Sequence, residues 1–510
     1  MRHGVFVKNA AVLTVTSLIL RTIGIFFRIF LSGKIGAEGM GLYQLIVSIY
    51  VLGSTFATSG ISTAVTRLIA DELVCGTARS VRHILRRSIL LSLGIGLVST
   101  ALIYFGADII SVYWIRDMRA AAALRMLAFS LPSMGISSCL RGYFIARRKA
   151  AGTSYAQLLE QVVRIGVIAL LIDRFADAGL AMACLAVMIG DTVAEWTSCA
   201  HLAIRCHIDK KRMQAELPIR AETRSPVVRR LLAIAAPITA GRYLNTILRT
   251  IENILVPNSI ATYCGSKERG LSEFGALKGM ALPLIFFPAS FLSALSTLLI
   301  PEISSANALH QRGKINRAIE HTLHLTLLSS ILIGAVFFAF SGEIGVLLYN
   351  SEDVGRYLLV LAPLTPIMYA ESIVDGILKG LNQQVSSLKY SIADSAIRIV
   401  LIVFLVPRWG MNGFLFIMVV SNVLTSFLNT HRLLKVTGVR LQWGRWIVRP
   451  LLGAATAVVL TQAVIHLSLF SGVSGIVLTI SGILCLCGIY CVLLSLLGCI
   501  RFSELHKSLS

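Results

Sequence analysis

The sequence predicts an all-α polytopic membrane protein. Its mean hydropathy is +0.78, and 56% of the 510 residues are hydrophobic. Charged residues make up 14% of the chain, whereas a soluble domain carries about a quarter. Apolar stretches long enough to cross a bilayer recur from one end of the chain to the other. These observations exclude a soluble globular protein.

Fourteen segments have the length and apolarity of a membrane crossing, which needs about 20 residues. In chain order they are residues 9–32, 42–70, 88–112, 121–146, 153–173, 179–204, 228–256, 272–300, 319–348, 356–380, 386–406, 411–434, 446–468 and 473–499. The first segment contains arginines and has no small-residue cleavage pattern. We therefore expect a retained helix there and not a signal peptide.

The net charge of +22 follows the loops between these segments. Even-numbered loops are basic, and odd-numbered loops are neutral or acidic. The basic loops contain Arg79, Arg82, Arg86 and Arg87; Arg147, Arg148 and Lys149; the stretch 205–230; and Arg432, Lys435, Arg440 and Arg445. This positive-inside pattern predicts a multi-pass membrane protein with both termini in the cytoplasm. It explains the charge without a nucleic-acid partner, since basic loops also face anionic lipids.

An internal repeat predicts two similar halves. Residues 124–172 align without gaps with residues 358–406. The matched pairs include Pro132 with Pro366, Gly142 with Gly376, Glu160 with Asp394, and Arg164 with Arg398. A spacing of six segments gives both copies the same orientation, as in parallel-repeat transporters. We expect an N-lobe (1–206), a basic cytoplasmic linker (207–227), a C-lobe (228–436) facing the N-lobe across a central cavity, and two added helices with a short cytoplasmic tail (437–510).

The sequence contains no motif for catalysis or for a cofactor. There is no phosphate-binding Walker loop and no nucleophile elbow with its partners. The ten cysteines have no metal-ligand spacing, and three of them fall inside one apolar run. We therefore expect neither an enzyme, a metal site nor a cofactor, and leave coupling to H⁺ or Na⁺ open.

Two arginines in the first segment are candidates for the wall of a cavity. Arg21 and Arg28 are seven residues apart, so they share one helix face, with Gly24 between them. An arginine at bilayer depth costs about 3 kcal/mol or more unless it faces protein or water. Guanidinium groups bind phosphate through two parallel hydrogen bonds. Snorkelling to the outer interface is the alternative for Arg28, which lies near Lys34.

The seventh segment carries a second set of candidates. Arg249 and Glu252 are three residues apart, and Asn253 is adjacent. Their spacing places them on one face, where they line the cavity or form an ion pair between helices.

Two ion pairs at i,i+4 spacing lie inside segments five and eleven. They are Glu160 with Arg164, and Asp394 with Arg398. A self-neutralising pair lowers the cost of charge in a membrane helix. We favour a structural role for both pairs, and keep both arginines as candidates for contact with substrate.

Carboxylates in the tenth segment are candidates for a coupling ion. Glu371 and Asp375 share a face with Lys379 at spacings of four. An intramembrane carboxylate can bind a proton or Na⁺. The alternative is a simple ion pair with Lys379 or with an arginine of the other lobe.

Three stretches resemble the stage V sporulation protein B family. They are RTIGIFFRIFLSGKIGAEGMGLYQL (21–45), EQVVRI (160–165) and APITAGRYLNTILRTIENILVP (236–257). This family belongs to the multidrug/oligosaccharidyl-lipid/polysaccharide exporter superfamily and is related to lipid II flippases. Arg21 matches the first cavity arginine of those flippases by its Gly24 context. Arg28 matches the second with one residue more of spacing. Glu252 stands where the family usually has aspartate.

The resemblance implies a flippase that moves an undecaprenyl-pyrophosphate-linked glycan by alternating access. The expected cargo is the peptidoglycan precursor lipid II for spore cortex or cell wall. Membrane lipids and glycosyltransferase or penicillin-binding proteins are the expected partners. Two alternatives stay open: a cation-coupled multidrug antiporter of the same superfamily, which would have an acidic N-lobe cavity, and a non-transporting scaffold for cell-wall synthesis, which would not need deep arginines.

Overall fold

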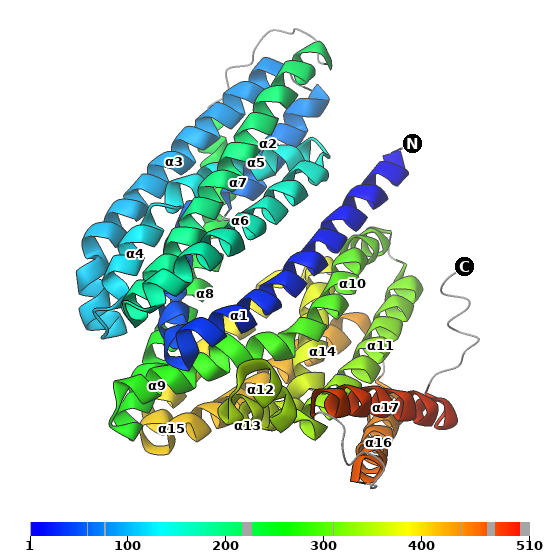
Figure 1. Ribbon diagram of the computed structural model, residues 1–510. Coiled ribbons are helices and arrows are strands. Elements are labelled where there is room, and N and C mark those ends of the chain that lie inside the picture. Colours follow the sequence, from blue (N-terminus) through cyan, green and yellow to red (C-terminus); the bar gives the residue numbers. More distant parts are fainter. Residues whose placement is uncertain are drawn as a thin grey trace. The chain divides into compact units, whose positions relative to one another are not determined.

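The computed structural model describes residues 2–58, 60–75, 78–216, 227–309, 311–439, 441–466 and 475–499 (Figure 1). Within these ranges every regular element is a helix, which confirms the expected all-α class. Packing divides the chain into two compact units, Met1–Gly275 and Ala276–Ser510, here called unit 1 and unit 2.

Unit 1 is built from nine α-helices and one π-helical segment in its described part. They are α1 (Arg2–Thr58), α2 (Ile61–Cys75), α3 (Ala78–Ile109), η1 (Ile110–Ile115), α4 (Ala120–Ala128), α5 (Leu131–Ala146), α6 (Ala150–Ala176), α7 (Leu180–Glu216), α8 (Val227–Cys264) and α9 (Lys267–Phe274). The π-helical segment η2 (Gly275–Ala281) follows α9.

Unit 2 continues with helices alone in its described part. They are α10 (Leu282–Ala308), α11 (Arg312–Ala339), α12 (Ser341–Tyr349), α13 (Glu352–Leu361), the 3₁₀ turn η3 (Ala362–Leu364), α14 (Thr365–Gly380), α15 (Gln384–Thr437), the π-helical segment η4 (Gly444–Val448), α16 (Arg449–His466) and α17 (Gly475–Leu496).

The number, length and apolarity of the helices are those of a multi-pass membrane protein. Eleven stretches of the described residues are long and apolar enough to cross a membrane, or twelve if the bent pair α4–α5 is one crossing. Two of the eleven, Thr14–Val74 and Gln384–Thr437, have 61 and 54 residues, whereas one crossing needs about 20. Each contains a non-helical glycine, Gly36 or Gly410. Dividing both stretches and counting the bent pair would reach the expected fourteen; that number and the cytoplasmic termini stay predictions.

Proline marks the bend in the fourth expected segment. Helices α4 and α5 meet at an angle of 41° at Phe129 and Ser130. Pro132 stands in the first turn of α5, where its missing N–H would have no partner inside the helix. In the tenth segment Pro363 lies in η3, directly before α14.

The core of unit 1 forms where α2, α3, α5, α7 and α8 pack together. Val65, Leu85 and Leu202 are completely buried there. Gly142 of α5 lies so close to α2 that a Cβ atom would approach the carbonyl oxygen of Ser62 to 2.7 Å. This close approach requires glycine at position 142.

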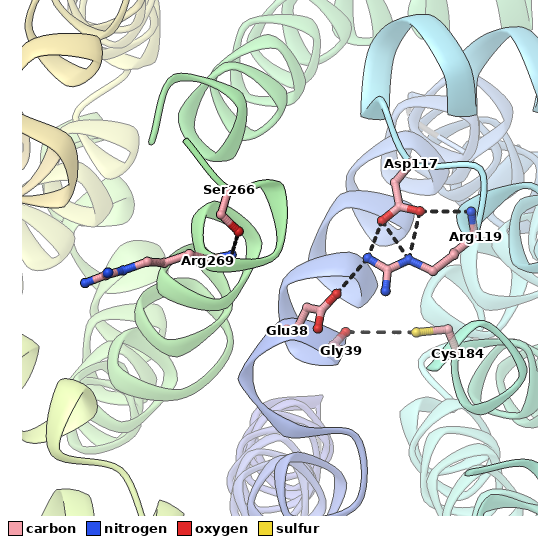
Figure 2. A network of polar contacts seen from close by, with 7 residues as sticks. All are labelled: Glu38, Gly39, Asp117, Arg119, Cys184, Ser266 and Arg269. Carbon is pink, nitrogen blue, oxygen red and sulfur yellow. Dashed lines mark hydrogen bonds and ion pairs between the residues drawn. The ribbon is translucent and has the colours of Figure 1, made fainter. Parts of the chain in front are cut away.

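An ion-pair network follows the bend in α1 (Figure 2). Gly36 has φ 66° and ψ −176°, a conformation essentially confined to glycine. Arg119, from the loop before α4, contacts Glu38 Oε1 and Asp117 Oδ2 through Nη2, at 2.7 Å each. Hydrogen bonds from Arg119 to Asp117 raise the pKa of Arg119 above its usual value, so the guanidinium stays charged. The network thus fixes the chain just after the bend.

In unit 2 the last two helices pack on α11. Tyr490 of α17 is buried, and its hydroxyl donates a hydrogen bond to the carbonyl oxygen of Leu328 at 3.1 Å. A second core gathers residues of α10, α11, α14 and α15, with Trp446 of η4.

The two units end at a different place from the expected lobes. Packing groups α8 and α9 with the preceding helices, up to Gly275. The sequence expectation places the start of the C-lobe at residue 228 and a linker at 207–227. Residues 217–226 of that linker, and the tail from residue 500, lie outside the described ranges. The lobe boundaries stay a prediction.

Candidate functional site

Unit 1 contains a polar cavity of about 670 Å³. Five helices of this unit contribute to its wall, namely α1, α2, α5, α7 and α8. Its polar lining residues are Gln44, Ser48, Thr55, Thr58, Ser62, Ser138, Arg141, Glu195, Arg242, Asn245, Thr246, Arg249, Thr250 and Asn253. Val47, Val51 and Met134 complete the lining. A space with so many hydrogen-bonding groups suits a hydrated or phosphate-bearing ligand.

Three arginines give this cavity its charge. Arg242 and Arg249 lie on α8 two helical turns apart and are exposed, while Arg141 comes from α5 and is half-buried. Glu195 of α7 is the one carboxylate among the lining residues of the described chain. Guanidinium groups bind phosphate oxygens in a planar, two-point geometry, so the wall is chemically suited to an anion.

Hydrogen bonds between α8 and α1 hold the cavity wall in place. Asn253 Nδ2 donates to Ser48 Oγ at 2.9 Å, and Thr250 Oγ1 donates to the backbone carbonyl of Ser48 at 3.3 Å. Further along, the hydroxyl groups of Thr55 and Thr246 are 3.4 Å apart. These contacts fix the face of α8 that carries Arg249.

A chain of ion pairs runs behind the cavity from α5 through α6 to α7. Arg141 Nη2 lies 3.2 Å from Glu160 Oε2, and Arg164 Nη2 lies 3.0 Å from Glu160 Oε1. Arg164 Nε in turn lies 2.6 Å from Asp191 Oδ1. Glu160 is therefore shared between two arginines, and Arg164 is shared between two carboxylates.

The candidates predicted for α8 have different environments. Arg249 and Asn253 line the cavity, whereas Glu252 is buried with only 2% of its surface exposed. In the first half of α1, Arg21 is exposed and Arg28 is half-buried. The functional roles predicted for all five residues stay predictions.

The candidates of unit 2 also form polar contacts. Arg398 Nε lies 3.4 Å from Asp394 Oδ2, and Ser421 Oγ donates to Asp394 Oδ1 at 2.7 Å. On α14, Asp375 lies 2.5 Å from Lys379, and Ser387 also donates to it at 2.5 Å. The half-buried Glu371 lies one turn before Asp375. The structural and ion-coupling roles given to these groups stay predictions.

Four residues of the site were not among the sequence candidates. Arg141, Arg242 and Glu195 line the cavity, and Asp191 extends the ion-pair chain through Arg164. Glu195 forms no ion pair in that chain among the described residues. Asp191 and Glu195 are two carboxylates at i,i+4 spacing inside an apolar segment. The rule that an ionisable residue inside a membrane segment is a functional candidate would have found them.

The described residues hold no group of three or more histidine, cysteine or acidic side chains arranged for a metal ion. Nine cysteines in this part of the chain are free thiols. The polar chemistry of the cavity is therefore that of its arginines, amides, hydroxyl groups and one carboxylate.

Comparisons with known proteins agree on the family and the fold. The sequence profile of the family described as "Polysaccharide biosynthesis protein" matches residues 6–307, and the MatE profile matches residues 268–404. Stage V sporulation protein B of Bacillus subtilis is 26% identical over 86% of this chain and 85% of its own length.

Two solved structures share the fold at low identity. The lipid II flippase MurJ in an inward closed conformation has a TM-score of 0.70 and 14% identity, covering 95% of this chain and 98% of its own. An inward-facing multidrug resistance MATE family transporter of the MOP superfamily has a TM-score of 0.66 and 14% identity, covering 82% and 96%.

The apolar helices define a multi-pass membrane protein, and its fold is the one seen in the MurJ flippase and MATE transporter structures. The chain belongs to the polysaccharide biosynthesis protein family, since that profile matches more than half of it. The predicted resemblance to the stage V sporulation protein B group is confirmed.

Proposed function

We propose that this protein is a flippase for a polyprenyl-pyrophosphate-linked saccharide, with the peptidoglycan precursor lipid II as its cargo. It moves the saccharide head group from the inner to the outer leaflet of the bacterial plasma membrane. A role in spore cortex or cell-wall synthesis belongs to the same proposal, as do cytoplasmic termini and alternating access.

The arginine-lined cavity of unit 1 carries this proposal. A pyrophosphate cannot enter hydrocarbon, because burying an unpaired charge costs several kcal/mol or more. Arg141, Arg242 and Arg249 offer it paired hydrogen bonds in a polar space of about 670 Å³. The neighbouring amide and hydroxyl groups suit the hydroxyl groups of a sugar.

The names of related proteins support the class of cargo. A MurJ structure that shares this fold is described as a lipid II flippase, and the sequence relative is a stage V sporulation protein. The first name points to a cell-wall precursor as cargo, and the second points to a role in spore formation. Membrane lipids are the surroundings in which such a cargo is presented.

The charge of the cavity favours this function over a drug antiporter. Three arginines face one carboxylate there, whereas a cavity for cationic drugs needs an acidic lining. A scaffold without transport would have no use for three guanidinium groups around one space. The two first-helix arginines, Arg21 and Arg28, are proposed to contact the same cargo during transport.

The test is rescue of cells depleted of their own lipid II flippase. Expression of this protein should restore lipid II on the outer leaflet and growth. Arg249→Ala and Arg21→Ala should each abolish rescue at normal protein abundance. Arg269→Ala is the matched control, because Arg269 is an exposed arginine of α9 outside the cavity lining. Full rescue by Arg249→Ala would contradict the proposed role of the cavity.

A further inference from the structure

One carboxylate beside the ion-pair chain of unit 1, that of Glu195, is not part of any pair in that chain. Helices α5, α6 and α7, which pack side by side in Figure 1, bring together two guanidinium groups and three carboxylates. Arg141, Glu160, Arg164 and Asp191 form a continuous series of pairs whose charges balance. Glu195, one helical turn after Asp191, is the third carboxylate and forms no ion pair in that series among the described residues.

Glu195 is buried but opens on the cavity. Only 6% of its surface is exposed, and it is one of the lining residues. Its Oε2 atom is inaccessible and has no hydrogen-bond partner among the residues that the structure describes. This is an unsatisfied polar atom of a residue at the wall of a polar space, and such atoms in native proteins are explained by a bound water or ion, by strain or by a functional role.

Groups from every neighbouring helix surround this carboxyl. They are Tyr50 of α1, Arg141 of α5, Glu160 and Arg164 of α6, Asp191 and Cys199 of α7, and across the cavity Arg242 and Arg249 of α8. Arg141 and Arg164 are already engaged by Glu160 and Asp191. Burial without a cation of its own therefore disfavours the charged form of Glu195, while the charges of Arg141 and Arg164 still favour that form.

An anionic ligand in the cavity would make protonation of Glu195 more favourable. Ionised Glu195 repels a phosphate in the same cavity and competes with it for Arg141. A neutral carboxyl does neither, and its O–H group can donate a hydrogen bond. Binding of the anion and binding of the proton therefore favour each other, as linkage requires.

We infer that Glu195 is a proton-binding site of this cavity, which takes up one proton when a phosphate-bearing ligand enters and releases it when the ligand leaves. The proton comes from cavity water and bonds to a carboxyl oxygen of Glu195. The coupling to an anion rests on the proposed function, whereas the proton site itself rests on the contacts of Glu195.

Infrared difference spectroscopy of the full-length protein tests the proton site without any ligand. Titration should reveal the carbonyl stretch of a protonated carboxyl in the wild type, absent in Glu195→Gln. Glu268→Gln is the control, because Glu268 is an exposed glutamate of α9. If Glu195→Gln fails to fold, Glu195→Asp must shift the frequency of the band. An unchanged band in both variants overturns the inference.

Calorimetry with inorganic pyrophosphate tests the coupling. In buffers of different ionisation enthalpy, the wild type should take up one more proton per bound pyrophosphate than Glu195→Gln; the comparison cancels the titration of the probe. Equal uptake overturns the coupling. A wild type that binds no pyrophosphate, with the infrared band still lost in Glu195→Gln, counts against the proposed function and supports the proton site.

Discussion

Two side chains of α8, three positions apart, differ sharply in environment. Arg249 is exposed in the cavity, whereas Glu252 is almost completely buried. The spacing in the sequence predicted a shared face, but it could not tell which residue meets the ligand and which meets the protein interior. That distinction depends on the neighbouring helices.

Replacing Arg249 should weaken anion binding without unfolding the protein. Loss of charge-assisted hydrogen bonds worth about 1.5–3 kcal/mol should reduce affinity for inorganic pyrophosphate about 10- to 100-fold in Arg249→Ala. Titration calorimetry measures the affinity, and thermal unfolding checks the fold. The same loss in Arg269→Ala would indicate a general effect of charge and would contradict a site at Arg249.

Exchanging the charges of Glu160 and Arg164 should destabilise unit 1. The exchange preserves their mutual pair, but it places a glutamate beside Asp191 and an arginine beside Arg141. Because 14–28% of these side chains is exposed, the loss should lie between the about 1 kcal/mol of an exposed pair and the about 3–5 kcal/mol of a fully buried one. Denaturant or thermal unfolding measures the loss.

The control is the same exchange in the exposed pair Asp108 and Arg125, which are 2.5 Å apart. An exposed pair contributes at most about 1 kcal/mol, so this exchange should leave stability nearly unchanged. Equal effects in both double variants would contradict the shared ion-pair chain. The sequence identified the pair of Glu160 and Arg164; Arg141 joins it only through tertiary packing, which no spacing along the chain reveals.

Element α1 consists of two helices that meet at a kink in the stretch where the sequence predicted a break. Residues 33–41 contain several glycines and polar residues, so segments 9–32 and 42–70 were expected to be separate. The backbone of Gly36 is non-helical, and the second helix continues from there to Thr58. The backbone changes direction at this one glycine, and helical hydrogen bonding is present on either side of it. The composition of this stretch does not tell which of its glycines adopts the non-helical backbone conformation.

Substituting alanine for Gly36 should destabilise the protein through the backbone alone. A Cβ atom at Gly36 would meet nothing within 4 Å, but its φ of 66° is strained for any other residue. We expect a loss of about 1–3 kcal/mol in Gly36→Ala. Thermal unfolding measures it.

Gly24→Ala is the matched control in the same helix. Its Cβ atom also meets nothing within 4 Å, and it has no positive φ. Alanine is favoured over glycine in a regular helix by about 1 kcal/mol, so this variant should be slightly more stable. A loss of stability in Gly24→Ala as large as in Gly36→Ala would argue against strain at the bend.

For the chain as a whole, hydropathy predicted the class of fold and its helical elements. The repeat of residues 124–172 in 358–406 places an i,i+4 ion pair in each unit, on α6 and on α15. The sequence expectation assigned α8 to the second half because it repeats the first segment. Packing groups α8 and α9 with unit 1, up to Gly275, and the lobe boundaries stay a prediction. A sequence repeat is defined by the order of residues along the chain, whereas a packing unit is defined by the contacts between helices in the folded protein.

Cysteine labelling should reveal the orientation of the chain. An impermeant maleimide applied outside intact cells should not label Lys211→Cys, an exposed position in the basic end of α7, but should after the membrane is opened. Met118→Cys, exposed in an odd-numbered loop, should react from outside. The unsubstituted chain gives the background from native cysteines. External reactivity at position 211 would reverse the predicted topology.

The network after the bend makes α1 responsive to the surrounding solution. Arg119 and Glu38 have 36% and 31% of their side-chain surface exposed, so dissolved ions compete for their contact. At about 1 M salt, electrostatic attraction is screened beyond roughly 3 Å. The 2.7 Å contact of Arg119 with Glu38 is close to that length, so the pair is weakened and not broken. The chain just after Gly36 would then be held less firmly, and its resistance to local unfolding should fall gradually as ionic strength rises.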